Sequence, residues 1–308
     1  MRIADFHCDL LSYLAEGEGR TAYDTASHAA IPQMLAGTVA LQTLAIYTKT
    51  DPGSLHLGTR QAEIFFELQK KYPEFKQIKT LLAIENASSF CEDNEPLDIG
   101  LNRISSWLSK AGKIGYISLT WNGENRFGGG NATKIGLKPD GLELLHWMDG
   151  KKIAIDLSHT SDKLAEDILK TIEDLDIPVV ASHSNFRAVC EHPRNLPDTI
   201  AQEIGARGGV IGLNFVRVFL GKNGPEDFLK QAEHADKLGL MDHWCFGADF
   251  FADHDVLPEL AYMKPFFHRG FENSSCYPQV IDLFSKHLSR DLLEKISSQT
   301  LTRFLGIP

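Results

Sequence analysis

Short apolar runs alternate with amphipathic segments along the whole chain. Continuous apolar runs of this length are typical of strands that are buried on both faces. We expect eight strands, at Ile3–Phe6, Thr38–Ile46, Ile78–Ile84, Ile114–Thr120, Ile153–Leu157, Pro178–Ala181, Gly209–Asn214 and Trp244–Ala248. Between them, apolar residues recur at helical spacing. These segments predict helices at Arg60–Lys71, Leu97–Ala111, Leu142–Asp149, Thr160–Thr171, Thr199–Arg207 and Pro225–Leu238.

Buried strands that alternate with helices indicate a parallel sheet covered on both sides. Eight such units predict an α/β fold in which the sheet closes into a (β/α)8 TIM barrel. A doubly wound open sheet is the competing architecture. The Gly-x-Gly-x-x-Gly motif common in that fold does not follow the first run. We therefore favour the closed barrel.

Residues 1–308 are expected to form a single barrel domain, because no internal repeat or linker interrupts the pattern. After the eighth run the pattern loosens, and residues 250–277 predict a long loop. Helices that close the C-terminus are expected at Val280–His287, Leu292–Ser298 and Thr300–Leu305. Two other irregular stretches are Ala15–Ala30 and Asn122–Gly141. Loops of this length often line or cover a functional site.

Composition narrows the classes of partner. The formal net charge of −10 argues against nucleic acid or an anionic membrane surface. No apolar stretch is long enough to span a bilayer, and the first residues do not resemble a signal peptide. The five cysteines are scattered and odd in number. This pattern favours a reducing environment, so we expect a cytoplasmic protein.

Candidate catalytic groups follow the predicted strands. In (β/α)8 barrels the catalytic residues lie at the C-terminal ends of the strands. The residues found there are His7 and Asp9 after strand one, Glu85 after strand three, His159 after strand five, His183 after strand six and Asp249 after strand eight. Each by itself has an ordinary structural explanation, such as a helix N-cap or a loop histidine. Their recurrence at equivalent positions favours one shared site.

The side chains of this set predict a metal centre. Imidazole and carboxylate groups without thiolates suit Zn²⁺ or a similar cation. Five ligands are more than one catalytic zinc uses while it keeps an open position, so we expect two ions. Glu85 is the natural bridge between them. His7 and Asp9 would then hold one ion, and His159 and His183 the other.

The chain also resembles the membrane (renal) dipeptidase family of zinc peptidases and its bacterial relatives. The resemblance covers most of the chain. It rests on Asp5-Phe-His-Cys-Asp9, Ile84-Glu85, Leu119-Thr-Trp-Asn122, Ile155-Asp-Leu-Ser-His159, Pro178-Val-Val-Ala-Ser-His-Ser184, His192-Pro-Arg-Asn-Leu-Pro-Asp198, Gly209-Val-Ile-Gly-Leu-Asn-Phe215 and Gly247-Ala-Asp-Phe250. The resemblance implies a (β/α)8 barrel with two zinc ions on the same five ligands, a small dipeptide-like substrate and a possible homodimer.

The resemblance implies further roles. Arg194 matches the arginine that holds the substrate's C-terminal carboxylate, although it could instead cap its own loop. Asp249 matches an aspartate near the substrate amine and the bridging water, where it would transfer a proton. A purely structural cap is the alternative for Asp249.

Two substrate contacts depart from the family pattern. Trp121 stands where the family has a histidine that reaches the scissile carbonyl, and an indole cannot titrate near neutral pH. Phe219 aligns with a substrate-contacting tyrosine and lacks its hydroxyl. We expect Trp121, its neighbour Asn122, and Phe219 to line the substrate site. The loop after Asp249 is also rebuilt, and either Asp253 or His254 could supply the missing group or simply be a solvated loop residue.

The leading hypothesis is a binuclear zinc dipeptidase, or a dipeptidase-like amide hydrolase, in which a metal-bridging hydroxide attacks the scissile carbonyl. A second hypothesis keeps the metals but changes the substrate to an N-acyl amino acid or a cyclic amide, because Trp121 and Phe219 alter the pocket. A third is a catalytically silent metal-binding protein.

Overall fold

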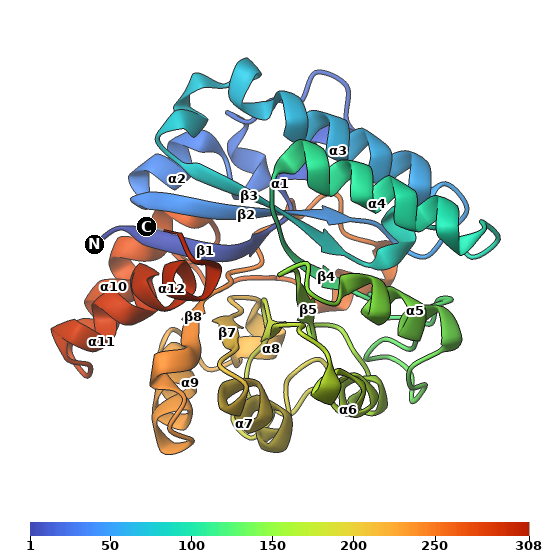
Figure 1. The fold of residues 1–308 in the computed structure, drawn as a ribbon. Coiled ribbons are helices and arrows are strands. Elements are labelled where there is room, and N and C mark those ends of the chain that lie inside the picture. The colour runs from blue at the N-terminus through green and yellow to red at the C-terminus, as the bar shows by residue number, and fades with distance from the viewer. Residues whose placement is uncertain (308) are drawn as a thin grey trace.

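Eight parallel strands close into a barrel in the computed structural model, which describes residues 1–307 (Figure 1). The strands are β1 (Ile3–Cys8), β2 (Val39–Tyr47), β3 (Lys79–Glu85), β4 (Ile114–Ser118), β5 (Ala154–Asp156), β6 (Val179–Ala181), β7 (Val210–Leu213) and β8 (Trp244–Phe246). Each strand pairs with the next, and the pairing of Asp5 with Phe246 closes the ring. The predicted (β/α)8 barrel is confirmed, and the open sheet is excluded because β1 and β8 are neighbours.

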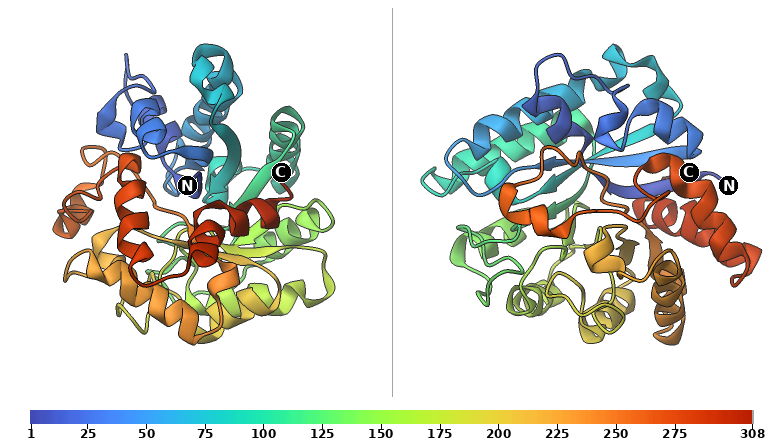
Figure 2. Two further views of the ribbon diagram at one scale, coloured as in Figure 1. Left: turned by 90° about the vertical axis from the view of Figure 1, so that its left-hand side faces the viewer. Right: turned by 180° about the vertical axis from the view of Figure 1, so that it is seen from behind.

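Helices cover the outside of the barrel between successive strands (Figures 1 and 2). They are α1 (Leu10–Glu16), α2 (Ile31–Ala36), α3 (Ser54–Lys71), α4 (Leu97–Ala111), α5 (Pro139–Met148), α6 (Asp162–Thr171), α7 (Asp198–Ala206), α8 (Arg217–Leu220), α9 (Glu226–Lys237), α10 (Tyr277–Ser285), α11 (Arg290–Glu294) and α12 (Thr300–Leu305). The sequence pattern missed α1, α2 and α8. These helices have only four to seven residues, too few to show a helical period.

Aromatic side chains fill the barrel interior at the N-terminal end of the strands. Phe6 of β1 and Tyr116 of β4 pack edge to face, with ring centroids 5.1 Å apart. Phe304 of α12 packs against Phe6 from the N-terminal end of the barrel, with ring centroids 6.3 Å apart. The C-terminal helix α12 therefore covers the N-terminal end of the barrel, and the C-terminal end is where a site is expected.

A β-bulge in β1 places His7 at the C-terminal end. Asp5 pairs with Gln42 and Cys8 with Leu44, so β1 has one extra residue at this point. The predicted strand ended at Phe6, and strict alternation would turn His7 away from the barrel axis if Phe6 faces it. The bulge lets Phe6 enter the interior while His7 faces the site above it. The strand runs through His7 to Cys8, so our prediction that His7 follows the strand was wrong.

Buried Asp5 stabilises the bulge. Its Oδ1 accepts hydrogen bonds from the backbone N–H groups of His7 and Ala248, at 3.3 and 3.0 Å. Its Oδ2 accepts one from the Tyr277 hydroxyl at 2.6 Å. Burial raises the pKa of Asp5, and these donors act in the opposite direction. One carboxylate thus ties β1, the end of β8 and helix α10 together.

Candidate active site

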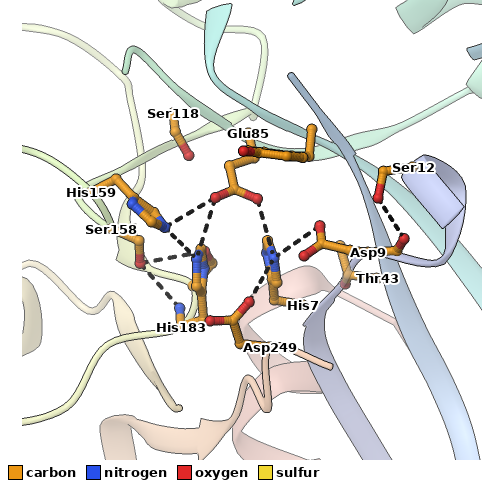
Figure 3. Close-up of polar contacts among 12 residues, drawn as sticks. His7, Asp9, Ser12, Thr43, Glu85, Ser118, Ser158, His159, His183 and Asp249 are labelled. Atoms are coloured by element: carbon orange, nitrogen blue, oxygen red, sulfur yellow. Dashed lines mark hydrogen bonds and ion pairs between the residues drawn. The ribbon is translucent and has the colours of Figure 1, made fainter. Parts of the chain in front are cut away.

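The predicted metal-binding side chains converge at the C-terminal end of the barrel (Figure 3). Glu85 is the last residue of β3, and Asp9 immediately precedes α1. His7 is the penultimate residue of β1, and the remaining members follow the ends of β5, β6 and β8: His159, His183 and Asp249. Five separate strands therefore deliver one compact cluster, as the sequence analysis predicted from the strand order.

Glu85 lies between two groups of histidines. Its Oε2 atom is 3.3 Å from Nε2 of His7. Its Oε1 atom is 3.0 Å from Nε2 of His159 and 3.7 Å from Nε2 of His183. One carboxylate oxygen thus faces each group, which is the arrangement expected of a bridging ligand. Asp9 and Asp249 complete the group around His7, each with an oxygen 3.6 Å from its Nε2.

The hydrogen bonds made by Nδ1 of His159 and His183 determine which nitrogen of each ring can act as a ligand. Nδ1 of His159 is 2.8 Å from Oδ1 of Asn122, an oxygen that only accepts hydrogen bonds. Nδ1 of His183 is 2.6 Å from the hydroxyl of Ser182, which donates its proton to Asp156 at 2.7 Å. Both Nδ1 atoms therefore donate, and both Nε2 atoms present lone pairs to the site.

The cluster fits a metal ion better than it fits a hydrogen-bond network. The Nε2 atoms of His159 and His183 are 3.1 Å apart with their lone pairs facing each other, an arrangement that calls for a cation between them. Nε2 of His7 and Oδ1 of Asp9 are buried without a hydrogen-bond partner. Zinc–nitrogen bonds of about 2.0–2.1 Å at tetrahedral angles put ligand atoms roughly 3.3 Å apart. The observed separations lie around this value.

Burial favours the neutral form of two ligand imidazoles, His159 and His183; it acts the same way on His7, but there the charges of Tyr116 and Glu85 outweigh it and raise the pKa. It lowers the pKa of His159 to about 4, with a further contribution from the Arg194 charge. Burial likewise holds the pKa of His183 well below its usual range. For Glu85, burial alone would raise the pKa, but the surrounding imidazoles outweigh it and hold the pKa well below its usual range. Neutral imidazoles beside an ionised carboxylate are ready to bind a divalent cation.

Two site residues have unusual backbone conformations. His159 and Asp249 both have positive φ, at 66° and 63°. Residues other than glycine seldom adopt this left-handed conformation, because Cβ then crowds the backbone. Such strain is concentrated at functional sites, where the surrounding fold holds it in place. Here it marks the turns that direct an imidazole and a carboxylate into the pocket.

Asp249 lies at the edge of the cluster. Its Oδ2 accepts a hydrogen bond from Nδ2 of Asn214 at 2.8 Å. Burial raises the pKa of Asp249 to about 7, with neighbouring Asp9 and Glu85 acting in the same direction. Sequence reasoning named Asp249 but not Asn214, whose side chain fixes it.

Arg194 is buried beside the cluster, with 4% of its surface exposed. Its Nη1 donates to the Ser184 hydroxyl at 2.7 Å, and its Nη2 donates to the His183 carbonyl oxygen at 2.8 Å. Its Nε is buried without a hydrogen-bond partner. Arg194 therefore does cap the loop after β6, and its Nε–H stays available for a further acceptor.

The predicted substrate contacts lie around one pocket. Trp121, Asn122 and Phe219 line it together with Asp9, Glu85, His159 and Asp249. Trp121 packs edge to face with Tyr47, with ring centroids 5.3 Å apart. Asn122 also has the structural role described above, because it holds His159. The use of these residues in substrate binding stays a prediction.

The two long loops meet at the mouth of this pocket. Arg20 forms a two-pronged ion pair with Asp255, at 2.6 and 2.7 Å, and thereby joins residues 15–30 to residues 250–277. His254 lies beside this pair, 3.3 Å from Arg20. Asp253 lies 3.7 Å from His28. Asp253 and His254 thus contact the other loop, as loop residues would, and neither is among the residues that line the pocket.

Sequence reasoning missed the hydroxyl group that supports His7. Tyr116 lies in the middle of β4, and its Oη is 2.6 Å from Nδ1 of His7. A tyrosine in an otherwise apolar strand was the available signal, because a buried phenol usually has a polar partner. When Nε2 of His7 binds a metal, Nδ1 carries the proton and donates a hydrogen bond to the Tyr116 oxygen.

We expect Tyr116→Phe to weaken zinc binding by roughly 10- to 100-fold, the usual effect of losing such a second contact. The His7 ring loses its orienting acceptor, while the aromatic packing with Phe6 remains. Competition against a chelator measures the affinity. The matched control is Tyr23→Phe, which removes a hydroxyl that bonds Glu74 on the surface. Unchanged zinc affinity in Tyr116→Phe would contradict this role.

The closed parallel barrel and its carboxylate-centred histidine cluster define a (β/α)8 barrel of the metal-dependent hydrolase type. A profile of the membrane dipeptidase family, peptidase family M19, matches residues 1–307. The chain belongs to this family of metallodipeptidases. The resemblance noted in the sequence is thereby confirmed.

Individual relatives agree with this assignment. An uncharacterized protein encoded in the pqqA 5′ region of Klebsiella pneumoniae is 36% identical over 222 residues, which cover 67% of this chain and 75% of that protein. An uncharacterized dipeptidase of Schizosaccharomyces pombe is 30% identical over 179 residues, covering 54% of this chain and 40% of the yeast protein. The match therefore spans less than half of the yeast protein.

A solved structure has the same fold. A metallopeptidase from Rhodobacter sphaeroides, crystallised with a phosphinate mimic of the dipeptide L-Ala-D-Ala, superimposes with a TM-score of 0.81. The alignment covers 99% of each chain at 20% sequence identity. Among residues 1–307, none of the helices combines the length and apolar character needed to cross a bilayer.

Proposed function

We propose that the protein hydrolyses dipeptides with two zinc ions bridged by Glu85. The observation that carries this proposal is the position of the Glu85 carboxylate, with one oxygen toward His7 and the other toward His159 and His183. His7 and Asp9 would hold the first ion, and His159 and His183 the second. Bound zinc would supply an acidified water and polarise the scissile carbonyl.

The protein's own residues would then orient the substrate and move the proton. Asp249 faces the first metal position and is fixed by Asn214, so it is placed to carry a proton toward the leaving amine. Arg194 has a buried donor without a partner, and a substrate carboxylate would satisfy it. The structure of the Rhodobacter sphaeroides enzyme with a dipeptide mimic supports the substrate class.

A panel of dipeptides tests the proposal. Purified protein is loaded with Zn²⁺, its metal content is measured, and release of free amino acids is followed for each dipeptide. We expect hydrolysis of several panel members and none by chelator-treated protein. If the metal-loaded protein cleaves no dipeptide but hydrolyses another amide, the substrate assignment is wrong.

The second hypothesis, an N-acyl amino acid or cyclic-amide hydrolase, is favoured by one observation. Two of the Arg194 nitrogens already bond to the protein, so its guanidinium serves the loop even without a carboxylate. A catalytically silent zinc-binding protein is the third hypothesis. Tight zinc binding without turnover of any amide would favour it.

Arg194→Ala distinguishes the first two hypotheses. We expect it to lower kcat/KM for dipeptides by roughly 10- to 100-fold, because a charged hydrogen bond contributes about 1.5–3 kcal/mol. Dipeptide amides lack the carboxylate and should be poor substrates of the unsubstituted protein. Arg194→Ala should therefore lower their kcat/KM very little. The control is Arg207→Ala, which removes an ion pair within α7. Equal losses for dipeptides and their amides would contradict the carboxylate role.

Three further features stay predictions. A homodimer and a cytoplasmic location rest on the family resemblance and on the cysteine pattern. All five cysteines are free thiols in the structure, which agrees with a reducing environment. Zinc as the native metal rests on the donor set and is checked by metal analysis of the protein as purified.

A further inference from the structure

The pocket above the ligand cluster has two unlike sides. It encloses about 700 Å³, which is large for a dipeptide of small residues. Charged side chains gather on the side of β1 and β2, where Asp9, Glu16, Lys49 and Asp51 line it. A second part of the lining, the apolar side, comes from α8 and the loop after β8, and most of its residues are apolar apart from Asp249 and Asp255. The two ends of a bound substrate therefore meet different surroundings.

The apolar side adjoins buried Arg194 at Phe219. The Phe219 ring in α8 lies 5.8 Å from the centre of the Arg194 guanidinium, and Phe219 lines the pocket. Val216, just before α8, lines the pocket beside it. A carboxylate bound to Arg194 would bring its own α-carbon, and hence its side chain, against this surface.

The apolar side continues into the loop after β8. The backbone N–H of Arg217 donates to the carbonyl oxygen of Phe266 at 2.7 Å, which attaches the loop to α8. Phe266 packs against Phe251, with ring centroids 5.2 Å apart. Phe251 and Leu260 are only half-buried in the structure and line the pocket. Half-buried apolar groups around a cavity gain free energy when a ligand covers them.

We infer that the C-terminal residue of the substrate carries a large apolar side chain, which packs against Phe219, Val216, Phe251 and Leu260. This inference rests on the proposed function, because Arg194 must hold the terminal carboxylate. The amino end of the substrate would then lie toward Asp9 and Asp249, the two carboxylates next to His7. Phe251, Phe219 and Leu260 are then specificity-determining residues.

The expected preference is large enough to measure. Burying a leucine or phenylalanine side chain contributes about 1.5–3 kcal/mol, which corresponds to roughly 10- to 100-fold in kcat/KM. Glycyl-phenylalanine and glycyl-leucine should therefore exceed glycyl-glycine and glycyl-glutamate by about this factor. Both enantiomers of the C-terminal residue are compared, since either can present its side chain to the apolar side.

Phe251→Ala tests the surface directly. The ratio of kcat/KM for glycyl-phenylalanine to that for glycyl-glycine should fall by about tenfold, because the truncation removes apolar contact with the larger side chain. Leu260→Ala is a second, milder variant. The matched control is Phe66→Ala, which truncates a half-buried ring beneath Lys110 on the outer helices. That control should leave the ratio unchanged.

Calorimetric binding of phosphinate dipeptide analogues gives a readout that does not depend on turnover. Two analogues that end in phenylalanine or glycine are compared on zinc-loaded protein. Tighter binding of the phenylalanine analogue, weakened in Phe251→Ala, supports the inference even if no dipeptide is hydrolysed, in which case the proposed function alone fails. Hydrolysis of all dipeptides without C-terminal preference, or equal binding of the two analogues, overturns the inference and leaves the proposed function standing.

Discussion

Glu85→Gln is expected to reduce dipeptide hydrolysis by more than about 1,000-fold, because the metal centre supplies several kcal/mol of transition-state stabilisation. The substitution keeps the shape of the side chain but replaces one carboxylate oxygen by an NH2 group, which cannot ligate a cation, and removes the negative charge. Since Glu85 faces both histidine groups, the variant should lose one zinc ion and bind the other weakly. Metal analysis after dialysis and kcat/KM on a cleaved dipeptide measure both effects.

The control for Glu85→Gln is Glu67→Gln, which makes the same change at an exposed ion pair with Lys70. Thermal unfolding with and without added zinc shows whether the folded protein still gains stability from the metal. Two firmly bound zinc ions and nearly normal activity in Glu85→Gln would refute the bridging role.

Asp9→Ala is expected to remove one zinc ion and nearly all hydrolysis. Oδ1 of Asp9 is a buried acceptor without a hydrogen-bond partner, 3.6 Å from Nε2 of His7. Without it, the first metal position keeps one imidazole, the shared carboxylate and Asp249, which is proposed to transfer a proton, so zinc should bind there much more weakly. The second position, at His159 and His183, keeps all of its ligands. Metal content should therefore fall from two ions to one.

The unequal loss separates Asp9→Ala from general unfolding. The control is Asp282→Ala, which removes a surface carboxylate paired with Lys286 in α10. Circular dichroism should show the same barrel in both variants, because Asp9 precedes α1 without capping it through its side chain. Undiminished metal content and activity in Asp9→Ala would show that Asp9 is not a metal ligand and would refute the proposed site.

The sequence predicted the barrel because the pattern is local. Each strand is buried on both faces, so its residues read as an unbroken apolar run, and each long helix shows its own period. The short helices could not be predicted in this way, because a helix such as α8, with only four residues, is too short to show a helical period. The prediction that His7 follows the strand was also wrong, because a bulge depends on the pairing with β2 and is not visible in the sequence of β1 alone.

The members of the site were predictable for a related reason. In a closed parallel barrel all strands end on the same side, so residues that follow different strands must meet. His7, Asp9, Glu85, His159 and His183 were therefore named together before any distance was known. The contacts behind them were not predictable, because Tyr116 and Asn214 act across strands that are far apart in the chain.

The sequence by itself determined the fold class, the family and the set of side chains that face the C-terminal end of the barrel. Only the tertiary structure decided how they are used: which ring nitrogens are free, that Glu85 faces both histidine groups, and that Arg194 keeps one donor for a ligand. It also decided that charged residues after β1 and β2 and mostly apolar residues of α8 and the loop after β8 line one pocket. The physical reason is that strand periodicity is a property of consecutive residues, whereas orientation, protonation and pocket shape depend on neighbours that only folding brings together.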